Sequence, residues 1–392
     1  MYSRLFTILL FFFGIHLFLY YSAVRFFIVT DSHLKNALFI ITSFLSVSFM
    51  ISAILVRVHI NLFTRAFYAL SAFWSGLAIY LLIAATIAWL IAVVCWIAGR
   101  TPPMCLIGSL LFAAAFLYSA YGVWNAFHPR ITNVEVGIPG LPERWQHKTI
   151  IQISDVHLGV IHTPRYFRGI IKTINSLHPD IIFITGDLFD SIGAENLSLF
   201  VEPLNELEAK NGIFYVNGNH ENYIGMDTVM SVLDKTKIRV LRDEVTQIDG
   251  MQIVGVDYPE FGIKGDVKKT ILSQKDFKKG MPSILLYHTP TSIDQNSTTA
   301  KEFQTRTYWN PDLDFTAARE LGINLQLSGH THRGQMIPFV YLAESLYRGY
   351  EYGFHREGDF SIYISSGLGT FGPHIRTGTE SEIVLIRLKP QS

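Results

Sequence analysis

Two kinds of hydrophobic pattern divide the chain. In the first third, apolar residues continue for longer than a membrane span with few interruptions, whereas the remainder alternates short apolar runs with polar turns. A helix needs about 20 mostly apolar residues to cross a bilayer. The stretches 5–29, 37–56, 66–98 and 104–127 meet that length. The pattern therefore predicts a transmembrane anchor region over residues 1–127, with a bundle of about four helices.

The first apolar stretch could be a signal peptide, but its apolar core is too long and no small-x-small cleavage site follows, which favours an uncleaved anchor. The stretch 66–98 exceeds one span, so a tilted helix or an interfacial extension is open. Apart from His16, ionisable groups are nearly absent from the middle of the spans. Intramembrane charges usually mark an ion or substrate path, so this pattern argues against a transporter or channel.

The cationic residues around the spans favour one orientation. With the N-terminus inside, the inner side carries Arg4, Arg57, Arg65, Arg130, Arg144 and Lys148, and the outer side carries Arg25, Lys35 and Arg100. Under the positive-inside rule this bias predicts a cytoplasmic C-terminal domain. One miscounted span would reverse the orientation.

A polar, proline-containing linker is expected at 128–147, followed by a domain over 148–392 that alternates strand-like and helix-like patterns, as an α/β fold does. Helices are expected at 166–177 and 197–207, although Pro203 weakens the second. Residues 292–309 are predicted to be a surface loop, and 336–388 to be mostly strands. Lys+Arg and Asp+Glu are balanced at 32 each, so charge does not indicate a nucleic-acid partner.

Five buried-strand patterns are each followed by side chains that can bind metal or transfer protons. IIQIS precedes Asp155 and His157, IIFITG precedes Asp187 and Asp190, GIFYV precedes Asn219 and His220, SILLY precedes His288, and NLQLS precedes His330 and His332. In open α/β sheets, ligands bind just beyond the carboxyl ends of the strands. The recurrence predicts one shared site.

The residue types indicate a two-metal site. Carboxylate, amide and imidazole ligands without a thiolate suit manganese, zinc or iron. Seven ligands are too many for one ion, and Asp187 is the natural bridge between two. We expect one ion on Asp155, His157, Asp187 and His332, and the other on Asp187, Asn219, His288 and His330. Such a pair would provide a metal-activated hydroxide for attack at phosphorus, with His220 as proton donor to the leaving oxygen and Asp190 orienting His220.

The motifs DVH at 155–157, GDLFD at 186–190, GNHE at 218–221, the lone His288 and GHTH at 329–332 resemble the calcineurin-like metallophosphoesterase superfamily, in order, over about residues 147–390. The resemblance implies a four-layer α/β/β/α sandwich with a dinuclear centre. The bacterial membrane-associated phosphodiesterase branch is more similar, since SSGLGTFGPHIRTGTESEI at 365–383 resembles its late segment. In that branch Gly-Gly-Gln typically follows GHTH, whereas this chain has Arg333 at the first of those positions.

The expected function is that of a multi-pass protein of the bacterial inner membrane. It would be a metal-dependent hydrolase, of the phosphodiesterase or phosphatase type, acting on a phosphodiester or pyrophosphate beside membrane lipids. Enzymes that hydrolyse UDP-diacylglucosamine belong to the same superfamily, so the resemblance makes such a lipid-linked substrate an expectation. The alternative is a membrane metal- or phosphate-binding sensor or scaffold without turnover. His374 and Arg376, in the late glycine-rich segment, would either reach substrate phosphate or stabilise a turn.

Overall fold

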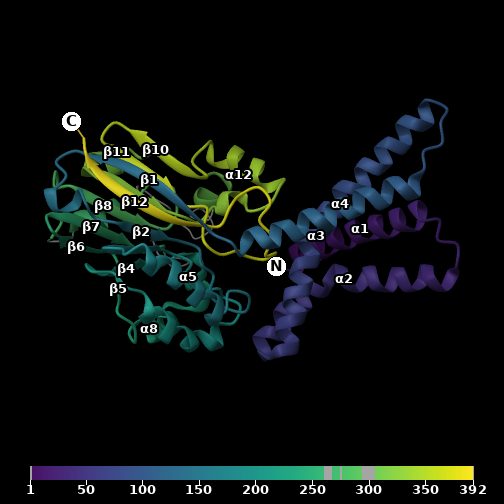
Figure 1. The fold of residues 1–392 in the computed structure, drawn as a ribbon, viewed down its shortest axis with the longest axis horizontal. Coiled ribbons are helices and arrows are strands. Elements are labelled where there is room, and N and C mark those ends of the chain that lie inside the picture. The colour runs from purple at the N-terminus through teal and green to yellow at the C-terminus, as the bar shows by residue number, and fades with distance from the viewer. Residues whose placement is uncertain (1, 260–266, 274–275, 294–304, 392) are drawn as a thin grey trace. The chain divides into compact units, whose positions relative to one another are not determined.

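The computed structural model describes residues 2–259, 267–273, 276–293 and 305–391 (Figure 1). The chain forms two compact units, which are described separately. One comprises Met1–Asn125 with Gly372–Thr377, and the other comprises Ala126–Phe371 with Gly378–Ser392.

Four long helices make up the first unit: α1 (Tyr2–Phe26), α2 (Ser32–Val58), α3 (Leu62–Ile97) and α4 (Met104–Ala126). All four are long and apolar enough to cross a membrane, which confirms the number expected from the hydrophobic pattern. Polar caps explain two of the breaks. The Asp31 side chain accepts a hydrogen bond from the Leu34 amide at 2.7 Å, and Asn61 forms a capping box with Thr64.

The polar side chain of His16, inside the helical unit, is hydrogen-bonded through both ring nitrogens. His16 donates from Nδ1 to the Phe12 carbonyl at 2.8 Å, and its Nε2 accepts from the Trp74 indole at 2.9 Å. Large hydrophobic side chains are exposed on all four helices. Contiguous exposed apolar surface of this kind suits a lipid environment, and a fully bonded His16 suits a packing role rather than a transport path.

The helical unit includes one short segment from the far end of the chain. The Arg376 amide donates to the Gly122 carbonyl at 2.9 Å, and the Asn125 side chain donates to the Arg376 carbonyl at 3.0 Å. The Tyr118 hydroxyl donates to the Thr377 carbonyl at 3.0 Å. Gly372–Thr377 is therefore held by hydrogen bonds between its backbone and residues of α4, and the Arg376 side chain is fully buried.

Among its described residues, the second unit contains two six-stranded sheets. The first has the order β1 (Arg130–Ile138), β12 (Glu382–Pro390), β2 (Ile150–Ile153), β3 (Ile181–Thr185), β4 (Ile213–Val216) and β5 (Ile238–Val240). The second has the order β10 (Gly353–Glu357), β11 (Phe360–Ile364), β9 (Leu325–Ser328), β8 (Ser283–Tyr287), β7 (Met251–Val256) and β6 (Glu244–Ile248). A shared core with Phe183 and Val216 from one sheet and Leu286 and Leu327 from the other joins them.

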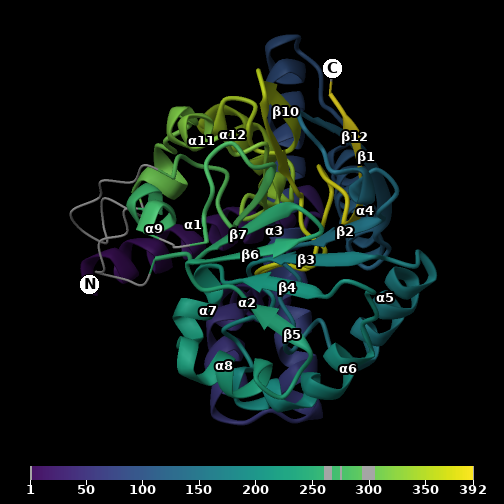
Figure 2. The same ribbon diagram turned by 90° about the vertical axis from the view of Figure 1, so that its left-hand side faces the viewer.

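Helices cover the outer face of each sheet (Figure 2). The first sheet is covered by α5 (Pro164–Ser176), α6 (Val201–Glu206) and α8 (Met226–Leu233), and the second by α9 (Val267–Ser273) and α11 (Thr316–Leu321). Other helices are α7 (Asn219–Ile224), α12 (Phe339–Tyr347), the 3-10 helices Glu143–Trp145, Ala194–Phe200 and His332–Gly334, and the π-helical turn Thr305–Trp309. The result is the four-layer α/β/β/α sandwich that the resemblance implied.

Several local expectations differ from the structure. Residues 128–147, expected to be a linker, contain β1, which pairs in parallel with β12. The helix expected at 197–207 is broken into a 3-10 helix and α6, and Pro203 lies in the first turn of α6, where no intrahelical donor is needed. The region 336–388, expected to be mostly strands, contains α12. Of the loop expected at 292–309, residues 294–304 lie outside the described residues, and Thr305–Trp309 is helical.

Candidate metal centre

The predicted ligands all lie just beyond the carboxyl ends of strands in the two facing sheets. Strands β2, β3 and β4 run parallel in one sheet, and β7, β8 and β9 run parallel in the other. The loops after these strands are joined by backbone hydrogen bonds. The Asp155 amide donates to the Gly186 carbonyl at 3.0 Å, and the Gly329 amide donates to the His288 carbonyl at 2.8 Å. Residues far apart in sequence are thus fixed side by side.

Left-handed backbone conformation is concentrated in these loops. Among the seven candidate ligands, five have a positive φ: Asp155 (51°), His157 (50°), Asp187 (49°), His330 (75°) and His332 (47°). Such a conformation is uncommon for residues other than glycine and costs about 1–3 kcal/mol each. The surrounding sheets therefore hold these residues in turns that direct their side chains toward a common point.

Two glycines in the motifs make room for the carboxylates. A Cβ at Gly218 would lie 2.6 Å from the Asp187 amide nitrogen and would overlap the Asp187 carboxylate. A Cβ at Gly329 would overlap both the Asp155 carboxylate and the Ser154 hydroxyl. Glycine is therefore required in GNHE and GHTH, because the backbone passes too close to a candidate ligand side chain to leave room for a Cβ.

The first group of donor atoms comes from Asp155, His157 and His332. The Nε2 atoms of His157 and His332 are 3.0 Å apart, and His332 Nε2 is 3.3 Å from Asp155 Oδ1. Asp155 is itself oriented by the His330 amide, which donates to its carboxylate at 3.1 Å. All three side chains are buried, so the group presents one carboxylate and two imidazoles without bulk water around them.

The second group comes from Asn219, His288 and His330. Asn219 Oδ1 is 2.9 Å from His330 Nδ1 and 3.2 Å from His288 Nε2, and the two imidazole nitrogens are 3.3 Å apart. The Nδ1–H of His288 donates to the Thr185 carbonyl at 2.8 Å. This bond directs the Nε2 lone pair of His288 toward the group, as an outer hydrogen bond does for histidines that bind metals.

The Asp187 carboxylate lies between the two groups. Its Oδ1 accepts a hydrogen bond from the His220 amide at 2.9 Å. Its Oδ2 is 3.4 Å from His288 Nε2 and 3.9 Å from His157 Nε2. One oxygen is thus held by the backbone, and the other faces donors of both groups.

The electrostatics of the site suit bound cations. Burial opposes ionisation of Asp155 and Asp187, but the neighbouring histidines outweigh burial and hold the pKa of each carboxyl below its usual value. Burial alone would lower the pKa of His288, but the Asp187 charge and hydrogen bond raise it to about 9. Burial lowers the pKa of His330 to about 3. The carboxylates that stabilise the protonated form of His288 would equally stabilise a divalent cation. Binding of that cation would displace the proton.

The donor set therefore fits the group that the sequence implied. Imidazole nitrogens that face one another within 3.0–3.3 Å, beside an ionised carboxylate, are typical of ligands converging on a cation. Two such groups share Asp187, so the residues present could hold two divalent metal ions.

His220 and Asp190 lie beside the ligands. Their Nδ1 and Oδ1 atoms are 3.6 Å apart. Burial would lower the pKa of His220, but Asp187 and Asp190 raise it to about 9. His220 also lies within 4.8 Å of donor atoms of His157 and Asp187, so distance alone does not separate a proton donor from a ligand.

Glu221 supports the site in a way that sequence reasoning missed. Its fully buried carboxylate accepts hydrogen bonds from the amides of Gly218 (2.7 Å), Asp187 (3.0 Å) and Phe189 (3.0 Å). Burial, with the nearby Asp187 charge, raises the pKa of Glu221 to about 7. The only sequence signal was its place at the end of GNHE. Glu221 joins the turn after β3 to the turn after β4, which positions Asp187 relative to Asn219.

Besides the candidate ligands, the sequence also singles out Arg333, His374 and Arg376. Arg333 has φ +50° and its guanidinium lies 4.6 Å from the Tyr352 ring centroid. The left-handed φ explains why glycine is common at this position in the branch that the sequence resembles. Phe371 lies with its ring 5.0 Å from that of His332. His374 and Arg376 are buried, and Arg376 lies in the segment held by α4, so the structure favours a structural role for it over phosphate contact.

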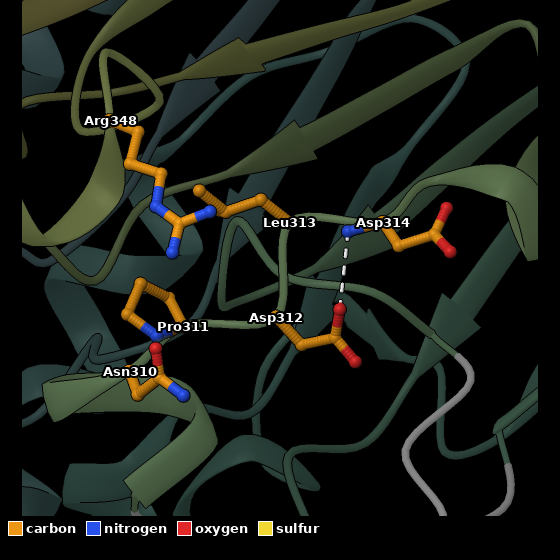
Figure 3. Close-up of a pocket in the computed structure, with 6 residues that line it drawn as sticks. All are labelled: Asn310, Pro311, Asp312, Leu313, Asp314 and Arg348. Atoms are coloured by element: carbon orange, nitrogen blue, oxygen red, sulfur yellow. Dashed lines mark hydrogen bonds between the residues drawn. The ribbon is translucent and has the colours of Figure 1, made fainter.

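A surface cavity of about 500 Å³ follows the turn Thr305–Trp309 (Figure 3). It is lined by Asn310, Pro311, Asp312, Leu313, Asp314 and Arg348. The Asp314 amide donates to the Asp312 carboxylate at 3.2 Å. None of the lining residues is a candidate ligand.

Replacing Glu221 by glutamine should weaken the site without removing a ligand. The amide nitrogen would face a backbone N–H, so at least one buried donor would lose its acceptor, at a cost of about 1–3 kcal/mol. We expect a lower Tm and metal affinity reduced by about 10- to 100-fold, measured by thermal unfolding and metal titration of the Glu221→Gln protein. Glu208→Gln, at an exposed position, is the control. Unchanged metal affinity would contradict the positioning role.

Comparison with known proteins gives the family. The model for calcineurin-like phosphoesterases matches residues 148–334. An uncharacterized metallophosphoesterase of Helicobacter pylori (strain ATCC 700392 / 26695) is 31% identical over 69% of this chain and 68% of its own length. One from Campylobacter jejuni is 31% identical over 72% of this chain and 69% of its own. A zebrafish (Danio rerio) transmembrane protein with metallophosphoesterase domain is 30% identical over 69% of this chain and 60% of its own length. The chain belongs to the calcineurin-like metallophosphoesterase family.

Proposed function

We propose that the protein is a membrane-anchored phosphoesterase that hydrolyses a phosphodiester or pyrophosphate bond. The observation that carries this proposal is the arrangement of Asp187 between two groups of buried donors, each with an amide or carboxylate oxygen and two imidazoles. One ion would be held by Asp155, His157, Asp187 and His332, and the other by Asp187, Asn219, His288 and His330. Bound there, manganese, zinc or iron ions would activate water and neutralise charge on phosphoryl oxygens.

His220 is proposed to donate a proton to the leaving oxygen. Its position beside His157, with ring centroids 4.5 Å apart, puts it next to the candidate ligands. Asp190 would hold the His220 ring in place and stabilise its cationic form. A general acid placed in this way contributes typically about 10²- to 10⁴-fold in rate.

The arrangement argues against a sensor or scaffold that binds without turnover. A site that only binds phosphate needs cationic groups but no proton donor. Here each of the seven ligand positions carries a residue able to bind metal, and a paired histidine and aspartate lie beside them. The complete set supports turnover.

The membrane setting supports a lipid-linked substrate, of which UDP-diacylglucosamine is an example. Four apolar helices would keep the phosphoesterase domain at a bilayer surface, where a lipid-linked phosphodiester or pyrophosphate is concentrated. We also propose that the protein lies in a bacterial inner membrane with this domain in the cytoplasm. The distribution of arginine and lysine around the helices supports that orientation.

Two substitutions separate binding from proton transfer. In the full-length protein, Asp187→Asn should abolish turnover and lower metal content, because the shared carboxylate is lost. His220→Ala should keep both metals but slow hydrolysis by about 10²- to 10⁴-fold for esters with alkoxide leaving groups. The loss should be smaller for bis-p-nitrophenyl phosphate, because p-nitrophenolate departs without a proton. Turnover would be measured on a dialkyl phosphodiester, whose leaving group is an alkoxide, and on bis-p-nitrophenyl phosphate, p-nitrophenyl phosphate and UDP-diacylglucosamine. Metal content would be measured on each purified protein.

Retained turnover in Asp187→Asn would contradict the proposed function. Loss of metal in His220→Ala would make His220 a ligand or a structural residue instead of a proton donor. No turnover of any substrate by the metal-loaded wild-type protein would favour the sensor.

Orientation can be tested with single cysteines in a Cys95→Ser, Cys105→Ser background. Arg100 lies between α3 and α4, and Glu143 is an exposed residue that follows β1. If the phosphoesterase domain is cytoplasmic, a membrane-impermeant maleimide should label Arg100→Cys in intact cells and Glu143→Cys only after permeabilisation. The opposite labelling would reverse the proposed orientation.

A further inference from the structure

Three tyrosines from separate segments lie against the second group of ligands. Tyr223 lies in α7, Tyr258 follows β7, and Tyr308 lies in the turn Thr305–Trp309. The ring centroid of Tyr308 is 4.5 Å from that of His330, and the centroid of Tyr258 is 6.4 Å from it. We refer to Tyr223, Tyr258 and Tyr308 as the tyrosine cluster.

The cluster reaches from the ligands to the proposed proton donor. The ring centroids of Tyr223 and His220 are 5.4 Å apart. The Tyr308 and Tyr223 side chains are close enough to interact electrostatically. Aromatic rings thus lie beside both His330 and His220.

The members of the cluster differ in exposure. Tyr258 is 1% exposed, and its amide donates to the Asn217 side chain at 2.7 Å. Tyr308 is partly buried and Tyr223 is 47% exposed. Tyr258 is therefore a fixed, buried ring behind His330, whereas Tyr308 and Tyr223 keep part of their surface exposed.

The chemistry of this surface suits a planar, polar ring. Aromatic side chains bind nucleobases by stacking, at a gain of about 5- to 150-fold in affinity for each base. Tyrosine hydroxyls add polar edges, which suit a heterocycle and its ribose but oppose an acyl chain.

We propose that the tyrosine cluster binds the base of a nucleoside attached to the scissile phosphate, so that the substrate is a nucleotide-containing phosphodiester or pyrophosphate. This inference rests on the proposed function, because it places the phosphate of the same substrate at the metal centre. Tyr308 and Tyr223 are the residues that contact the base, and Tyr258 is a positioning residue.

Calorimetric titration of the full-length, manganese-loaded protein in detergent tests the proposal. The ligands are UMP, AMP, glycerol 3-phosphate and inorganic phosphate. Wild-type protein should bind the nucleotides at least about tenfold more tightly than glycerol 3-phosphate, since only the nucleotides carry a base. Tyr308→Leu and Tyr223→Leu should each weaken nucleotide binding by about 5- to 150-fold and leave glycerol 3-phosphate binding unchanged. Tyr308→Phe should retain most of the nucleotide affinity.

Tyr341→Leu, at a 63% exposed tyrosine of α12, is the matched control and should change neither affinity. Thermal unfolding of each variant checks that it folds. Equal wild-type affinity for UMP and glycerol 3-phosphate would overturn the proposal, as would a parallel loss of both in the tyrosine variants. If neither inorganic phosphate nor glycerol 3-phosphate binds to protein shown to hold metal, the proposed function fails as well.

Discussion

The position of the Asp187 carboxylate is the constraint on which the rest of the site depends. Its Oδ1 is held by the backbone, and its Oδ2 faces imidazoles from both sheets. A buried carboxylate needs charge compensation, and its neighbours are imidazoles that bind metal in their neutral form. Divalent cations on either side of Asp187 would satisfy this requirement. The two sheets must therefore meet with their ligand-bearing ends in register, which the shared core between them enforces.

The sandwich stabilises a local arrangement that is unfavourable by itself. Five candidate ligands with a left-handed backbone conformation, and the buried carboxylate of Glu221, each raise the free energy of the folded turns. They persist because hydrogen bonds join the loops across strands, as between Asp155 and Gly186, and because Glu221 pairs with three amides. The cost is concentrated where ligand geometry has to be maintained, which is the usual relation between strain and function.

The sequence predicts that the candidate ligands lie together because one rule covers all of them. A short apolar run of four or five residues predicts a buried strand, and the polar residues after it lie at the edge of the sheet. The contribution of Glu221 depends on backbone amides of other turns, so the pattern carried no sign of it. The tyrosine cluster was missed because its three rings meet only after α7, β7 and the turn at Tyr308 have folded. The sequence predicts a linker where β1 forms, because proline and glycine turn signals follow β1 directly and its partner β12 lies at the far end of the chain.

Metal content, measured together with electron paramagnetic resonance, tests directly whether Asp187 is shared by two metal ions. The full-length protein would be stripped with a chelator, reconstituted with manganese and freed of excess metal by gel filtration. If Asp187 is shared by two ions, the protein should hold two manganese ions per chain, and the spectrum should show exchange coupling between them. One ion per chain, or two ions without coupling, would contradict a centre bridged by that carboxylate.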